Sequence, residues 1–331
     1  MIITESLAKG LTHRFLSEAQ DIISKSLKKL EKEAGGYKNS KSGWEKYVGK
    51  ARSILQNVAI SFYEGGSKTS PYFAFVGLSV DKDREFNSWN EMCLSGEAVI
   101  QSHHPRFIDT SGACFNVGEH AISRIYERSK LGMIDEFTVD IYSILPEFQQ
   151  LPLWSAFWIG NLAVITDNFS KHFFPHFYHP VIPAKSGIFL CELTHVKFPK
   201  VEVRTFVDDK NLSEEQLRLK KILWDIGIIY KSSPLAAFPI TNSVESDYYV
   251  NMAVLGELAE HAELITNTLF QNNSSPQFAA RAQENFLNLI KNARTERSAK
   301  LSEIYRKIGI QKTQLIIKKE KLRSSMSATK A

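Results

Sequence analysis

Strand-forming segments are confined to the middle of this chain, which limits the fold classes open to it. Five segments rich in aromatic and β-branched residues lie between residues 60 and 230, at 72–80, 97–108, 162–166, 187–193 and 201–207. Helical segments separate them irregularly, so the regular strand–helix alternation of a doubly wound sheet is missing. The sequence therefore predicts an α+β fold with a mixed or antiparallel sheet of about five strands.

Long helices are predicted on both sides of this core. Residues 3–34 carry apolar side chains mostly three or four positions apart, and Gly35 and Gly36 then end the helix. Residues 44–59 form a second predicted helix. Residues 231–243 contain two prolines and are expected to form a linker, followed by helices at about 247–270 and from Pro276 onward. We therefore divide the chain into an N-terminal helical arm (1–59), an α+β core (60–230) and a C-terminal helical region with a basic tail (231–331).

Helices are also predicted inside the core. Asn116 and Glu119 approximate a capping box, which predicts that a helix starts at Asn116. Ser213 and Gln216 form a second box, with a helix continuing to about residue 224. Residues 135–144 form a third expected helix. In the last sheet segment, apolar and polar residues alternate over 201–207, which predicts a half-exposed strand.

The net charge of +5 is small but unevenly distributed. Residues 281–331 hold 13 Lys and Arg against 4 Asp and Glu, a local charge of +9 that leaves −4 on the remaining chain. A basic helix can follow a phosphate backbone, so nucleic acid, RNA or DNA, is a predicted partner. The residues predicted to contact it are Arg294, Arg297, Lys300, Arg306 and Lys307. The alternatives are a bundled helix with a solvated basic side, an acidic partner protein and a membrane surface. A homo-oligomer formed through the terminal helices is a separate prediction.

The most specific candidate for catalysis is the helix predicted to start at Asn116. His120, Arg124 and Arg128 are four residues apart and share one helix face, opposite the apolar residues expected to pack on the sheet. Arginine binds phosphate with a permanently charged fork, and histidine exchanges protons near neutral pH. Metal-independent RNA cleavage requires these two properties together. A solvated basic face is the alternative interpretation.

The segment His120-Ala121-x-x-Arg124, followed by Arg128, resembles a short signature of some small ribonucleases of bacterial toxin–antitoxin pairs. The resemblance covers only residues 120–128. It implies ribonuclease activity, with His120 as general acid or base. It further implies a second cation, for which the strand carrying Arg204 is the candidate.

Three histidines form a second candidate site. His172, His176 and His179 have a spacing that a helix would place on one face, and three imidazoles suit a catalytic zinc ion. Pro175 and Pro180 disfavour a regular helix there, and the metalloprotease pattern H-E-x-x-H is absent. The alternative is an aromatic-rich loop packed against the sheet.

Other classes are disfavoured by the sequence. The three cysteines, Cys93, Cys114 and Cys191, are far apart and are expected to be buried, reduced side chains. Neither a phosphate-binding loop nor a dinucleotide-binding glycine motif occurs. No apolar stretch reaches 18 residues and no secretion signal is evident, so we expect a cytoplasmic protein.

These patterns favour a protein that acts on nucleic acid, in its sharpest form a metal-independent ribonuclease of a toxin or phage-defence type. His120 would transfer protons, and Arg124, Arg128 and Arg204 would neutralise the phosphate, with no cofactor. Two alternatives remain at this point. One is a non-catalytic oligomerising protein that docks an anionic partner, and the other is a zinc-dependent hydrolase using His172, His176 and His179.

Overall fold

The structure, a computed structural model, describes most of the chain. The described residues are 4–36, 40–56, 58–66, 70–81, 92–102, 108–128, 141–166, 180–195, 199–231, 233–237, 245–270 and 276–307. Its helices are α1 (Glu5–Gly36), α2 (Lys41–Leu55), α3 (Glu119–Arg128), α4 (Ile141–Phe148), α5 (Leu151–Thr166), α6 (Glu214–Tyr230), α7 (Pro234–Ala237), α8 (Glu245–Leu258), α9 (Ala262–Phe270) and α10 (Pro276–Lys307). No helix of this described part combines the length and the apolar character needed to cross a membrane.

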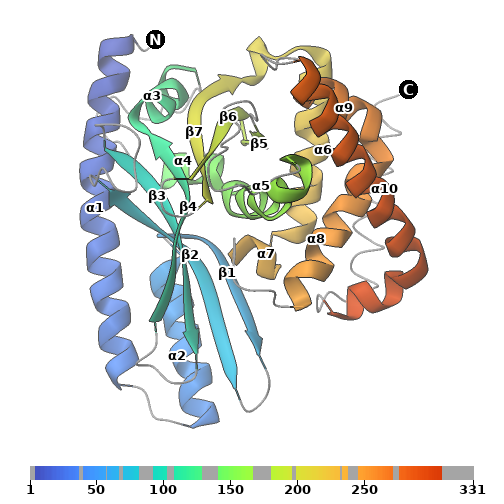
Figure 1. The fold of residues 1–331 in the computed structure, drawn as a ribbon. Coiled ribbons are helices and arrows are strands. Elements are labelled where there is room, and N and C mark those ends of the chain that lie inside the picture. The colour runs from blue at the N-terminus through green and yellow to red at the C-terminus, as the bar shows by residue number, and fades with distance from the viewer. Residues whose placement is uncertain are drawn as a thin grey trace, which may run out of the picture.

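The core is a curled mixed sheet in the order β1-β2-β3-β4-β7-β6-β5 (Figure 1). Its strands are β1 (Ala59–Gly66), β2 (Pro71–Asp81), β3 (Cys93–Ser102), β4 (Ile108–Gly118), β5 (Val181–Pro183), β6 (Gly187–His195) and β7 (Pro199–Asp208). Strands β4 and β7 pair in parallel, and all other neighbouring pairs are antiparallel. The predicted mixed α+β class is therefore confirmed, but the sheet has seven strands instead of five.

The differences in the sheet have local causes. The prediction missed β1, β4 and β5, and it merged the end of β3 with the start of β4 at 97–108. Residues 162–166, predicted as a strand, form the last turn of α5. Residues 151–159 of α5 are buried and the helix is apolar around its circumference, and a short apolar run in such a helix has the composition of a buried strand.

The predicted helix start at Asn116 is wrong. Asn116 lies in β4, fully buried, and its Oδ1 accepts a hydrogen bond from Ser95 Oγ at 2.9 Å. Helix α3 begins at Glu119, whose Oε1 accepts from the backbone N–H of Met92 at 3.1 Å. Asn116 therefore binds a residue of strand β3, and Glu119 binds Met92, the residue that precedes this strand.

Several predicted helices agree with the structure. Helix α1 ends at Gly36, as expected from its two terminal glycines, and α10 begins at Pro276. Helix α6 has the complete capping box, in which Ser213 and Gln216 each bind the other's backbone N–H. These boundaries were predictable because they depend on neighbouring residues alone.

The two long terminal helices lie on opposite sides of the molecule (Figure 1). Helix α1 packs against α2, α3 and β2, whereas α10 packs against α8, α9 and α5. The buried stripe of α10 consists of Ala282, Phe286, Ile290 and Ala293. Both helices thus bury their apolar faces within their own chain, and their described parts do not pair with each other.

Gly227 in α6 provides a stability test of this packing. A Cβ at this position would lie 1.6 Å from Oε1 of the buried Gln150, so the Gln150 amide occupies the space of the missing side chain. We expect Gly227→Ala to lower the free energy of unfolding by about 1–3 kcal/mol, because the amide must move in a packed interior. Urea denaturation measures this change.

The matched control is Gly49→Ala, at an exposed helical position in α2 with open space around it. This substitution should be neutral or stabilising by roughly 0.5–1 kcal/mol, because alanine favours the helix. Equal effects of the two substitutions would contradict the described packing of Gln150 on Gly227.

The carboxyl group of Glu147 in α4 gives a pH-dependent prediction. Burial raises the pKa of Glu147, although the backbone N–H and Oγ of Ser186 donate to it at 3.0 and 2.8 Å and Lys220 and Lys185 are nearby. The folded state therefore binds the proton of the Glu147 carboxyl more tightly than the unfolded state does. The protonated carboxyl contributes stability at low pH, and this contribution is lost as the pH rises through the raised pKa of Glu147. We expect Glu147→Gln to gain stability relative to the unmodified protein as the pH rises above the ordinary range of a glutamate carboxyl, about pH 4. Urea denaturation at several pH values tests this, and a constant difference would contradict it.

Candidate functional site

Helix α3 carries the predicted catalytic face. His120 is exposed, while Ile122, Ile125 and Tyr126 are buried, as the spacing predicted. Arg124 donates to Glu127 Oε2 at 2.6 Å. Arg128 donates to the backbone carbonyl of Phe206 in β7, also at 2.6 Å. The two arginines are half-exposed and already bound within the chain.

A polar pocket of about 190 Å³ lies between α1 and α3. Its lining consists of two histidines, a lysine, an arginine, three glutamates and two hydroxyl residues. They are Glu5, Lys9, Thr12 and His13 from α1, and Glu119, His120, Ser123, Arg124 and Glu127 from α3. Of the residues predicted for catalysis, His120 and Arg124 line this pocket.

Each charged group of this α1–α3 pocket has an opposite charge nearby. Lys9 Nζ is 2.9 Å from Glu5 Oε1, and His13 Nε2 is 3.7 Å from Glu119 Oε2. The hydrogen bond and charge of Lys9 are the main causes that lower the pKa of Glu5, with smaller contributions from Arg124 and His120. The electrostatic field of α3 therefore reaches the first turn of α1.

The lining supplies two groups that can exchange protons and two that can bind an anion. His13 and His120 are both solvent-accessible. Lys9 and Arg124 provide permanent positive charge beside them. An acid, a base and cations around one small pocket are the components of acid–base catalysis on a phosphate ester.

Sequence reasoning missed the contribution of α1. The helix at 3–34 was predicted from its apolar residues alone, and His13 and Lys9 belong to its polar residues. About a hundred residues separate them from α3 in the sequence. A His and a Lys four residues apart on the polar face of α1 were the available signal. Nothing in the local sequence indicates that this face meets α3.

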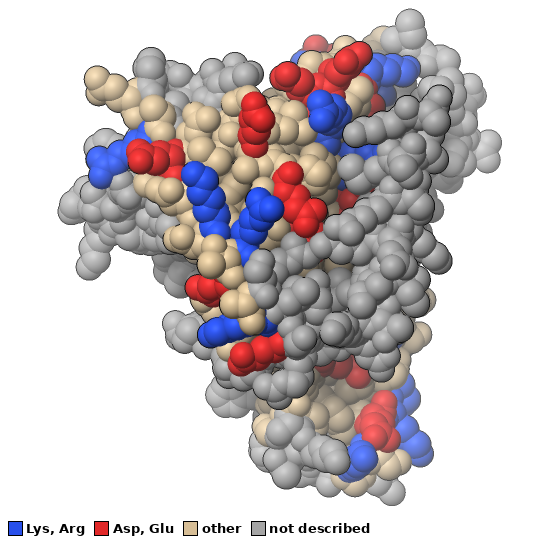
Figure 2. All heavy atoms as spheres, turned by 90° about the vertical axis from the view of Figure 1, so that its right-hand side faces the viewer, with Lys and Arg blue, Asp and Glu red and all other residues tan. Residues whose placement is uncertain are grey.

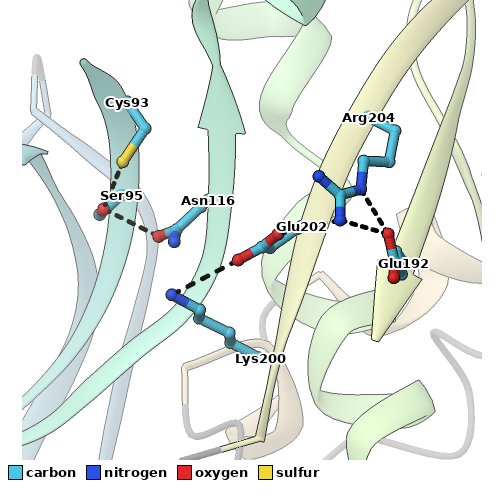
Figure 3. Close-up of polar contacts among 7 residues, drawn as sticks. All are labelled: Cys93, Ser95, Asn116, Glu192, Lys200, Glu202 and Arg204. Carbon is cyan, nitrogen blue, oxygen red and sulfur yellow. Dashed lines mark hydrogen bonds and ion pairs between the residues drawn. The ribbon is translucent and has the colours of Figure 1, made fainter. Parts of the chain in front are cut away.

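Arg204, the fourth predicted catalytic residue, belongs to a different cluster, a row of polar residues across the sheet (Figure 3). Strand register aligns four of them side by side, namely Ser95 in β3, Asn116 in β4, Glu202 in β7 and Glu192 in β6. Arg204 forms an ion pair with Glu192 and lies 3.5 Å from Glu202. It does not line the α1–α3 pocket.

The polar face of β7 is largely buried, which corrects the predicted half-exposed strand. Glu202 is 0% exposed and Lys200 is 4% exposed, and Lys200 Nζ lies 3.6 Å from Glu202 Oε1. Strand β7 lies between β4 and β6 and contacts α3 and α5. An alternating pattern could not reveal that both faces of this strand are covered.

The histidine cluster lies outside the described residues. His172, His176 and His179 all fall in the segment 167–179, so zinc binding there stays a prediction. Within the described ranges, no group of three or more His, Cys, Asp or Glu side chains could hold a metal ion. The three cysteines are free and buried, and burial raises the pKa values of the Cys114 and Cys191 thiols.

The predicted basic face of α10 is described in part. Arg294 and Lys300 are exposed, while the side chains of Arg297, Arg306 and Lys307 lie outside the description. The backbone leaves helical geometry at Lys300, where α10 is kinked. Figure 2 shows described Lys and Arg residues on this side of the molecule interspersed with Asp and Glu.

Comparison with known proteins does not assign the chain to a class. No family model matches the sequence, and neither the curated proteins nor the solved structures contain a significant match.

Proposed function

We propose that this protein acts on nucleic acid as a metal-independent ribonuclease, with the α1–α3 pocket as its active site. The observation that supports this proposal is the presence of His13, His120, Lys9 and Arg124 in the lining of one pocket. A toxin or phage-defence role is the setting that we propose for such an activity.

The proposed reaction is cleavage of RNA by its own 2′-hydroxyl group. One imidazole accepts the 2′-hydroxyl proton while O2′ forms a bond to phosphorus. The bond from phosphorus to O5′ breaks, and the other imidazole, in its protonated form, donates its proton to O5′. The products are a 2′,3′-cyclic phosphate and a 5′-hydroxyl end.

Lys9 and Arg124 stabilise the negative charge that develops on the phosphoryl oxygens. Each would exchange a carboxylate for the substrate phosphate. The Lys9–Glu5 pair is easily displaced, because both side chains are about two-thirds exposed and an exposed ion pair of this kind adds little stability. Arg128 and Arg204 have partners elsewhere, and the roles first predicted for them stay untested.

The exposed Arg294 and Lys300 of α10 add sequence-independent affinity for RNA in this proposal. Their effect should weaken with salt, whereas the chemistry in the α1–α3 pocket should not depend on them. The two parts of the proposal can therefore be tested separately.

The test is incubation of the purified full-length protein with RNA and with DNA of the same sequence, in the presence of a metal chelator. We expect cleaved RNA with 2′,3′-cyclic phosphate ends and intact DNA, because DNA lacks the 2′-hydroxyl nucleophile. Intact RNA, or equal cleavage of both substrates, would refute the proposed mechanism.

A further inference from the structure

Ser123 of α3 lines the α1–α3 pocket, although the reaction proposed above gives it no role. The residue is only 5% exposed, and it shares its helix with His120 and Arg124 of the same lining. Its hydroxyl group forms no hydrogen bond with another residue in the described part of the chain. Buried polar groups are nearly always hydrogen-bonded, so a ligand in the pocket is the partner expected for Ser123.

The second hydroxyl residue of the lining, Thr12, is already bound. Its Oγ1 donates to the backbone carbonyl of Ala8 at 2.9 Å, so its proton is used within α1. The hydroxyl proton of Ser123 is therefore the one available to an acceptor atom in the pocket.

The charges of the lining show why such a neutral donor matters. Three glutamates face two permanent cations, Lys9 and Arg124. When both histidines are neutral, charge alone therefore does not hold an anion in the pocket. A hydroxyl that donates to a phosphoryl oxygen forms a charge-assisted hydrogen bond, which supplies part of the missing affinity.

The size and composition of the pocket limit what accompanies the phosphate. Its volume is about 190 Å³, whereas sites for whole organic ligands begin at about 300 Å³. Apart from the two imidazoles, the described lining has no aromatic ring on which a base could stack and no side-chain amide that could bind its edge. Carboxylates, in contrast, accept hydrogen bonds from ribose hydroxyl groups. The lining therefore suits a phosphate and a sugar better than a base.

We propose that the α1–α3 pocket binds the phosphate and ribose of RNA and leaves the base outside, with the Ser123 hydroxyl donating to a phosphoryl oxygen. This proposal rests on the proposed function, which names RNA as the substrate. It adds Ser123 to Lys9 and Arg124 as a phosphate-binding residue. It also implies cleavage without preference for a particular base, because no described group of the pocket is suited to distinguish one.

Isothermal titration calorimetry of the full-length protein with ribose 5-phosphate and the four ribonucleoside 5′-monophosphates tests the proposal without requiring cleavage. We expect the five affinities to agree within about tenfold, since a stacked base would add about that factor or more. Ser123→Ala should weaken the binding of each ligand by about tenfold, the effect of losing a hydrogen bond to a charged group. Circular dichroism should show that this variant is folded.

Ser17→Ala is the matched control, because Ser17 is an exposed serine one turn beyond His13 in α1 and does not line the pocket. It should leave the affinity for ribose 5-phosphate unchanged. Absence of ribose 5-phosphate binding at millimolar concentration would overturn the proposal. Unaltered affinity in Ser123→Ala would do so as well, and so would nucleotides that bind far more tightly than ribose 5-phosphate. Ribose 5-phosphate binding by a protein that leaves RNA intact would support the assigned ligand and refute the ribonuclease activity alone.

Discussion

Replacing His120 with Gln is expected to slow RNA cleavage by about 10²–10⁴-fold, the usual contribution of a general acid or base. Glutamine keeps the size and polarity of the side chain but cannot exchange protons near neutral pH. His120 is exposed in the first turn of α3, so the substitution should leave the fold intact. Initial rates on a fluorescently labelled RNA measure the effect.

The comparison variants are chosen from the same helices. His13→Gln should cause a loss of similar size, and the double variant should be little worse than either one, because the two groups act in one step. Arg14→Gln is the control, since Arg14 is the neighbour of His13 but pairs with Glu18 and does not line the pocket. Loss of activity in Arg14→Gln alone, with His120→Gln fully active, would remove the basis for the assigned site.

Replacing Glu202 with Leu should cause the largest loss of stability, about 3–5 kcal/mol in the free energy of unfolding. Glu202 is completely buried, 3.6 Å from Nζ of the buried Lys200 and 3.5 Å from Arg204. Leucine removes the carboxylate beside the buried ammonium group of Lys200, where the loss of an opposite charge is costly, whereas Arg204 keeps its ion pair with Glu192. Urea denaturation monitored by circular dichroism measures the effect.

The double variant Lys200→Met/Glu202→Leu separates charge from packing. Because well-packed apolar residues can replace a buried ion pair with little penalty, the double variant should recover most of the lost stability. Glu45→Gln disrupts the exposed pair with Lys41 and should cost less than about 0.5 kcal/mol. A loss in Glu202→Leu as small as that in Glu45→Gln would show that the polar row contributes little to the fold.

The elements that could be predicted are those specified by neighbouring residues. Helix α6 has a complete capping box at Ser213 and Gln216, α10 begins at a proline, and α1 ends at two glycines. Strands β2, β6 and β7 were visible as aromatic and β-branched runs. Local signals were therefore sufficient for most helices and for part of the sheet.

The errors occurred where tertiary context overrides the local signal. Asn116 has the composition of a helix cap, but it pairs with Ser95 in the buried sheet. The polar row of Ser95, Asn116, Glu202 and Glu192 exists only because β4 and β7 are neighbours in the strand order. His13 could not be combined with His120 before the contact between α1 and α3 was known.

Hydrogen–deuterium exchange with a non-cleavable 2′-O-methyl RNA tests most directly whether RNA binds in the α1–α3 pocket. The proposed site predicts slower exchange in peptides that cover residues 5–13 and 119–127, whose helices form the pocket. Protection of α10 through its basic residues is compatible with the proposed site but does not replace protection of the two pocket peptides. Unchanged exchange in both pocket peptides under conditions in which RNA is bound would contradict the account.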